Sequence, residues 1–106
     1  MKILKVTDEA IIFDNGSTIT FDHSPDCCEW NYADFLQIDD IAKDYNFNEN
    51  LKFKPVKGAG FRFGDNHQMV FVPCYSEQNG YYSCDIDIYY NNEHVLYLEE
   101  CEEILS

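Results

Sequence analysis

The sequence predicts an α+β fold in which one domain, residues 1–106, is built mainly from an antiparallel sheet of about six to seven strands. Aromatic residues make up 16% of the chain, a content that favours strands. Asn15-Gly16 separates two apolar runs, which is typical of a tight hairpin. Helical spacing of apolar residues occurs in one short stretch, so one short helix is expected to pack on the sheet.

The N-terminal hairpin is predicted to join strands at Ala10–Asp14 and Ser17–Asp22. Asn15-Gly16 suits the turn between them because both positions of a two-residue loop need positive φ. This loop length pairs Ile12 with Ile19, so these two side chains share one face of the hairpin.

Two further strands are predicted, the first of them beside this hairpin. Met1–Val6 provides the first. Ser24-Pro25-Asp26 then reads as a turn, because proline supplies the fixed φ of its second position, and a strand follows over Cys27–Ala33. Alternation along that strand places Cys28, Trp30 and Tyr32 in the core and Cys27, Glu29 and Asn31 on the outer face.

The predicted helix depends on four apolar residues whose spacing puts them on one helical face: Ile38, Ile41, Ala42 and Tyr45. Asp39 and Asp40 fall in its first turn, where the helix dipole stabilises carboxylates. Asn46–Asn50 is predicted to be the loop that ends the helix.

The rest of the chain is predicted to form a meander, with strands at Phe61–Phe63, Met69–Tyr75, Tyr81–Tyr90 and His94–Glu99. Pro73 cannot donate to a sheet ladder, so its strand is predicted to lie at an edge or to contain a bulge. Gly58-Ala59-Gly60 is not followed by the G-K-[ST] residues and the helix that complete a phosphate loop. It is therefore interpreted as the entry to a hairpin.

The final hairpin has two alternative registers. A two-residue loop would set Asp87 against Leu96, whereas a loop of all three residues 91–93 aligns Ile88 with Leu96 and Ile86 with Leu98. Only the second register matches the apolar faces, so it is preferred.

The formal net charge of -13 is large for a chain of 106 residues. It argues against binding to nucleic acid or to an anionic membrane, because both depend on Lys and Arg neutralising phosphates. Four of the seven basic residues are Lys52, Lys54, Lys57 and Arg62, and none follows Arg62. The C-terminal segment is therefore either an ordinary solvated surface or an acidic face that mimics nucleic acid or meets a basic partner.

The five cysteines and the N-terminus bear on the cellular compartment. Met1–Lys5 contains no apolar run of signal-peptide length, and no stretch is long enough to span a bilayer. The odd number of cysteines favours free thiols over a disulfide framework. A cytoplasmic location is expected.

Two short segments carry a resemblance to a known family. His23-Ser24-Pro25-Asp26-Cys27-Cys28-Glu29 resembles the H-x-x-D-C-C-E signature of an uncharacterised family of small phage and bacterial proteins. Tyr75–Ser83, which contains Asn79-Gly80-Tyr81-Tyr82, resembles the N-G-Y-Y-S signature of the same family. The resemblance implies a phage or mobile-element context and no particular reaction.

The first signature could be structural, metal-binding or catalytic. Adjacent strand residues point to opposite faces, so Cys27 and Cys28 could share one metal ion only at a bulge or turn. A cysteine nucleophile with His23 as its base would still need an oxyanion hole, which the sequence does not provide. The structural interpretation is preferred, with His23 and Asp26 closing a turn and no metal or other cofactor.

The second signature is also interpreted as structural. Asn79-Gly80 supplies positive φ at the end of a loop, and Tyr81 and Tyr82 send one ring to each face of a strand. The leading hypothesis is a non-catalytic, acidic protein-interaction module, with self-association through strand edges left open. The alternative is a thiol- or metal-dependent site built on His23, Asp26, Cys27 and Cys28.

Overall fold

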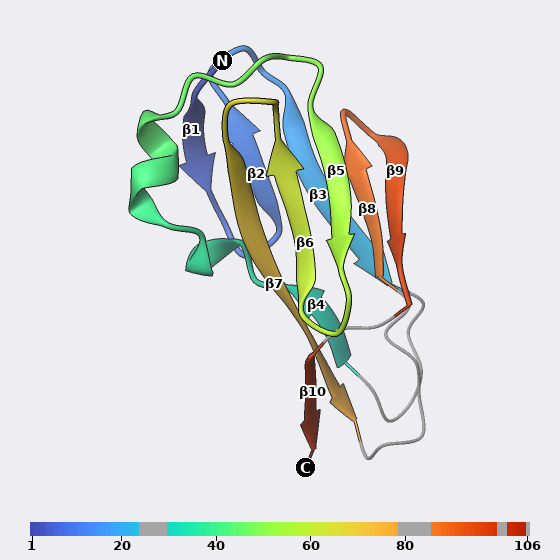
Figure 1. The fold of residues 1–106 in the computed structure, drawn as a ribbon. Helices are drawn as coiled ribbons and strands as arrows, with labels where there is room; N and C mark the ends of the chain where they lie inside the picture. Colours follow the sequence, from blue (N-terminus) through green and yellow to red (C-terminus); the bar gives the residue numbers. More distant parts are fainter. Residues whose placement is uncertain (24–29, 79–85, 100–101, 106) are drawn as a thin grey trace.

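The computed structural model describes residues 1–23, 30–78, 86–99 and 102–105. Within them, ten strands form two five-stranded sheets, which face each other as two layers (Figure 1). The first sheet is antiparallel throughout, in the order β1 (Ile3–Val6), β2 (Ala10–Phe13), β3 (Thr18–His23), β8 (Ile86–Tyr90) and β9 (Glu93–Leu98). The mainly antiparallel architecture that the sequence predicts is confirmed.

The second sheet is organised around the long strand β7 (Met69–Gln78). Its first half pairs with β6 (Gly60–Gly64), which pairs in turn with β5 (Lys52–Val56). Its second half pairs antiparallel with β4 (Trp30–Ala33) and parallel with β10 (Glu102–Leu105). Sequence patterning predicted neither β5, whose apolar alternation Pro55 interrupts, nor β10, whose Glu102-Glu103 obscures a strand pattern.

The core lies between the two sheets and is rich in aromatic rings. Phe13 of β2 meets Phe63 of β6 with ring centroids 6.3 Å apart, and Phe47 packs against both. These three side chains are almost fully buried. Edge-to-face rings of this kind add about 0.5–1.5 kcal/mol to the free energy of area burial, so the cluster holds the two layers together.

The N-terminal hairpin has a register one residue away from the predicted one. The Phe13 amide donates to the Ser17 carbonyl at 2.9 Å, which makes Asp14, Asn15 and Gly16 a three-residue loop. Gly16 has a φ of 87°, as the last residue of such a loop requires. The predicted pairing of Ile12 with Ile19 is therefore wrong.

This shift determines which side chains of the hairpin enter the core. Ile11 pairs with Ile19, and both are fully buried together with Phe13. A slip of one residue moves a whole strand face from solvent to core. Burying the Phe13 ring therefore favours the longer loop over the shorter turn.

The C-terminal hairpin has the predicted strand pairing but a different loop. Ile88 pairs with Leu96 and Ile86 with Leu98, as predicted. The turn itself contains only Asn91 and Asn92, with φ of 52° and 66°. The register then shifts between Ile88 and Tyr89, so a β-bulge takes up the extra residue that the prediction assigned to the loop.

The predicted helix is present as two short 3-10 segments, η1 (Phe35–Gln37) and η2 (Asp40–Asp44). Ile38 and Asp39 between them are extended, which prevents one continuous helix. Ala42 and Ile38 are buried, whereas Ile41 is 55% exposed instead of facing the core. None of the helical segments in the described ranges is long and apolar enough to cross a membrane.

Within the described strands, Pro73 is the last residue of the half of β7 that pairs only with β6, so the predicted strand edge is present on its other side. It is buried and pairs with Gly60, the first residue of β6, and Cys74 next to it pairs with Ala33 of β4. The Pro73 carbonyl accepts from the Asp34 amide at 2.8 Å. A proline is tolerated here because the partner of β7 changes at this residue, so its missing N–H removes no regular ladder bond.

The turn between β6 and β7 is fixed by Asp65. One oxygen of its carboxylate accepts from the backbone amides of His67 and Gln68, at 2.9 and 3.1 Å. The other accepts from the Asn48 amide at 3.2 Å, which attaches the loop before β5 to this turn. These bonds, that from His67 foremost, favour the ionised form and lower the pKa of Asp65.

Candidate functional site

Most of the residues in the two signatures lie outside the described ranges. These are Asp26, Cys27, Cys28, Glu29, Asn79, Gly80, Tyr81 and Tyr82. His23 is the last residue of β3, where its backbone pairs with Ile86. The structural interpretation and the thiol or metal alternative both remain predictions.

The described strands nevertheless bring the ends of the two signature segments together. β3 ends at His23, the first residue of the first segment, and β4 begins at Trp30, just after that segment. β7 ends at Gln78, within the second segment, and β8 begins at Ile86, shortly after that segment. Because β3 pairs with β8 and β4 with β7, the four strand ends lie at one end of the fold (Figure 1).

The face of β4 that enters the core is the opposite of the predicted one. Asn31 and Ala33 are buried, whereas Tyr32 is half-buried and its ring lies 5.5 Å from that of Tyr75. Ala33 and Asn31 pair with Cys74 and Ser76, which follow the inward alternation of β7. Register with β7 therefore decides the face, although the larger apolar residues of β4 favoured the other.

The buried Asn31 forms a polar contact across the strands. Its Oδ1 accepts a hydrogen bond from the Ser76 hydroxyl, whereas its Nδ2 has no hydrogen-bond partner in the described structure. An unsatisfied buried N–H costs about 1–3 kcal/mol. Asn31 lies two residues after the first signature segment, and Ser76 lies within the second.

Cys74 is the one cysteine in the described ranges, and it is a buried free thiol. Desolvation, together with the nearby Asp34 carboxylate, raises the pKa of Cys74 to about 12. The thiolate is the nucleophile and the metal ligand, so a thiol with this pKa is inert at neutral pH. Within the described residues, no cluster of three or more His, Cys, Asp or Glu side chains is arranged to hold a metal ion.

We therefore expect Cys74 to resist alkylation in the native protein. At pH 8, iodoacetamide should leave Cys74 unmodified for hours and should modify it within minutes after unfolding in urea. Peptide mapping by mass spectrometry distinguishes Cys74 from the other four cysteines. Rapid native labelling of Cys74 would contradict the burial and the raised pKa.

A groove lies between η2 and the first half of β7. Its volume is about 290 Å³. Ile41, Ala42 and Tyr45 line one side of this groove, and Met69, Val70 and Phe71 line the other. We call it the η2–β7 groove. Ile41 and Phe71 are 55% and 39% exposed, so apolar side chains reach solvent at its mouth.

One wall of the η2–β7 groove is an unpaired strand edge. The Cys74 amide donates to Ala59 on the β6 side, whereas the Pro73 carbonyl accepts from Asp34 on the opposite side. Backbone groups alternate sides along a strand, so the N–H and C=O of Phe71 point away from β6, as the C=O of Pro73 does. In the described residues, no strand pairs with β7 on that side before Cys74.

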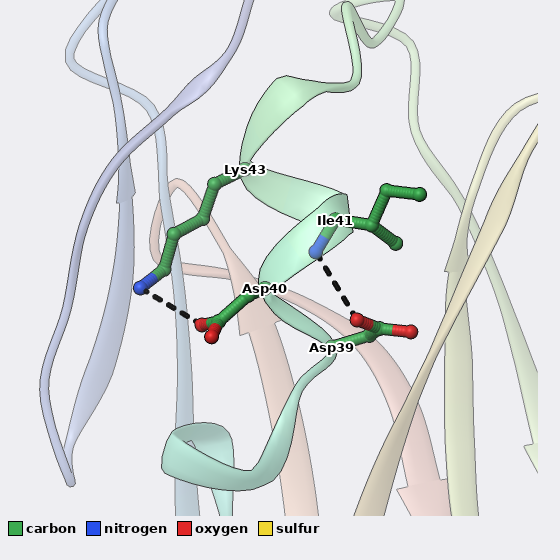
Figure 2. A network of polar contacts seen from close by, with 4 residues as sticks. All are labelled: Asp39, Asp40, Ile41 and Lys43. Carbon is green, nitrogen blue, oxygen red and sulfur yellow. Dashed lines mark hydrogen bonds and ion pairs between the residues drawn. The ribbon is translucent and has the colours of Figure 1, made fainter.

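Among the described residues, the other wall of the groove contains one carboxylate, that of Asp39. Figure 2 shows Ile41 and Asp39 on one side of η2 and the pair Asp40–Lys43 on the other. Asp39 caps η2 by accepting from the Ile41 amide at 3.1 Å. Lys43 lies 3.4 Å from Asp40, but both side chains are more than half exposed, so this pair has little strength. Asp44 adds a further carboxylate to the segment.

The residues of this groove could not be selected from the sequence. The run Met69-Val70-Phe71-Val72-Pro73 is apolar throughout, so it does not reveal which side chains face outward. The helical spacing around Ile41 predicted a core position for it. The available signal is Pro73 itself, since a proline in a strand indicates that one side of the ladder is interrupted nearby.

Comparison with known protein families places the chain. Residues 1–88 match a domain of unknown function, DUF7448. The chain belongs to the DUF7448 family. The match ends within β8, so β9 and β10 of this DUF7448 protein lie beyond the matched residues. No curated protein and no solved structure matches the chain.

Proposed function

We propose that this DUF7448 protein is a non-catalytic protein-interaction module of phage or mobile-element origin, which acts in the cytoplasm. The two signature segments in the sequence support the proposed origin. Genes for phage functions beside its coding sequence would strengthen that origin, and a neighbourhood of housekeeping genes would count against it.

The observation that carries the proposal is an unpaired strand edge in a chain with a large excess of carboxylates. The chain has 20 Asp and Glu against seven Lys and Arg, so 13 carboxylates would remain even if each basic residue neutralised one. Such a surface attracts basic partners and accelerates their association. The partner that fits is an extended, basic segment of another protein.

The η2–β7 groove supplies the geometry for this segment. An extended chain added beside Phe71 would receive main-chain hydrogen bonds from the unpaired edge of β7. Alternate side chains would enter the groove against Val70 and Ile41, both of which line it. Lysine or arginine side chains would meet Asp39, which lines the groove. Main-chain pairing gives affinity in this binding mode, whereas the pockets and charges give specificity.

The test uses a short fluorescent peptide in which lysine alternates with valine. We expect Phe71→Pro to weaken its binding at least about tenfold, because proline removes the N–H that faces the peptide and leaves the β6 ladder bonds in place. Phe71→Ala is the matched control, since it removes the ring and keeps the N–H. Fluorescence anisotropy measures both dissociation constants.

Two results would contradict this proposal. Equal binding by Phe71→Pro and Phe71→Ala, both with wild-type circular dichroism, would show that the strand edge is not used. Unchanged binding of a peptide methylated on alternate backbone nitrogens would show the same, because such a peptide cannot add to a sheet. Absence of any binding to the unmodified peptide would reject the basic-partner function itself.

A further inference from the structure

The outer face of the second sheet gathers positive charge in an otherwise acidic protein. Lys54 of β5 pairs directly with Arg62 of β6, and Arg62 pairs with Phe71 of β7. All three side chains are exposed, as is Lys52 two residues before Lys54. We call these four residues the basic face. It shares Phe71 with the η2–β7 groove but includes none of the carboxylates of η2.

The arrangement of these charges is unfavourable for the isolated protein. Like charges directly opposite each other on neighbouring strands destabilise a sheet, and Lys54 and Arg62 are such a pair. Neither forms an ion pair with any described residue, although the chain has 20 carboxylates to offer. The fold therefore keeps two cations together and unneutralised.

The surroundings of Arg62 leave its guanidinium accessible. Its neighbours on the same face of β6 are Gly60 and Gly64, which carry no side chains. Phe71, 39% exposed, supplies an apolar surface at the adjacent position. An arginine guanidinium can donate two parallel hydrogen bonds to one carboxylate, and a neighbouring aromatic ring offers contact area to an apolar side chain.

We propose that the basic face binds a short acidic segment of a second protein. Carboxylates of that segment would pair with Lys54 and Arg62, and one of its apolar side chains would pack against Phe71. A protein segment fits better than nucleic acid because the net charge of -13 repels a long phosphate backbone. At an ionic strength of about 0.15 M, electrostatic interactions extend only about 8 Å, so a short ligand responds to the local cations more than to distant carboxylates.

The test compares two charge-reversed proteins of equal net charge. The probe is a short labelled peptide of glutamates around one phenylalanine, at an ionic strength of about 0.15 M. We expect Lys54→Glu with Arg62→Glu to weaken binding at least about tenfold and Lys2→Glu with Lys5→Glu to change it less than about twofold. Lys2 and Lys5 are exposed and lie at or next to β1, in the first sheet.

Salt dependence gives a second measurement on the unaltered protein. Affinity should rise as the ionic strength increases from about 0.01 M to about 0.15 M, where repulsion from the whole molecule is screened, and fall toward about 1 M, where the contacts are screened as well. Equal weakening in the two charge-reversed proteins, or affinity that only rises with salt, would overturn the proposal. Tighter binding of a single-stranded oligonucleotide than of the peptide would also overturn it.

Discussion

Replacing Gly60 by alanine is expected to destabilise the protein by more than about 3 kcal/mol. Gly60 begins β6 with a φ of 155°, a backbone conformation that L side chains rarely adopt. An added Cβ would overlap the Val72 carbonyl oxygen and lie 2.9 Å from the Cys74 amide nitrogen. Both atoms belong to the backbone of β7, so relief requires the two strands to separate. Urea unfolding followed by circular dichroism measures the loss.

Gly58→Ala is the matched control for this substitution. Gly58 lies in the turn before β6 with a φ of 72°, and nothing lies within 4 Å of an added Cβ. The cost there is limited to the left-handed backbone, about 1–2 kcal/mol. Equal losses from Gly60→Ala and Gly58→Ala would show that contact with β7 contributes nothing, contrary to the structure.

The sequence predicted strands well where a turn residue and apolar alternation agree. Asn91-Asn92 and the isoleucines of β8 led to the observed pairing of Ile88 with Leu96. The prediction reached this pairing through a longer loop, because a β-bulge leaves no signal in a single sequence. At Asn15-Gly16 the same kind of reasoning gave the wrong register, since local turn preference does not include the burial of Phe13.

Tertiary context decided the features that patterning missed. Asn31 is buried because β4 aligns with the inward residues of β7, a pairing between segments 45 residues apart in the chain. Ile41 is exposed because two extended residues, Ile38 and Asp39, divide the predicted helix. The η2–β7 groove depends on this exposure of Ile41 and therefore could not be predicted from local sequence.

Charge was the most informative property of the sequence for the candidate sites. The cluster of basic residues from Lys52 to Arg62 is visible without a structure. What the sequence could not give is their geometry: β5 was not predicted as a strand, so the opposition of Lys54 and Arg62 on one face was not apparent. The same missing strand hid the contrast between this face and the carboxylates of η2.

The second large effect is expected in the aromatic core. Phe63→Ala should lower the free energy of unfolding by about 3–5 kcal/mol, because it removes a fully buried ring and leaves a cavity. The Phe63 ring contacts those of Phe13 and Phe47, with centroids 6.3 and 5.7 Å away. Its removal therefore takes away the contact that joins β6 to the first sheet. The total free energy of unfolding of a domain of this size is about 5–15 kcal/mol, so the variant should be close to unfolding at 37 °C.

Phe71→Ala deletes the same atoms from a neighbouring strand and serves as the control. Because Phe71 is 39% exposed on the outer face, its loss should cost less than about 1 kcal/mol. Urea midpoints of the two variants, measured with the same denaturant slope, compare the two positions directly. Similar midpoints would mean that Phe63 does not join the two layers and that the sheets are held together by other contacts. If only Phe71→Ala keeps a midpoint near that of the wild type, the fold does not depend on the Phe71 side chain, and this side chain is available for binding on the outer face.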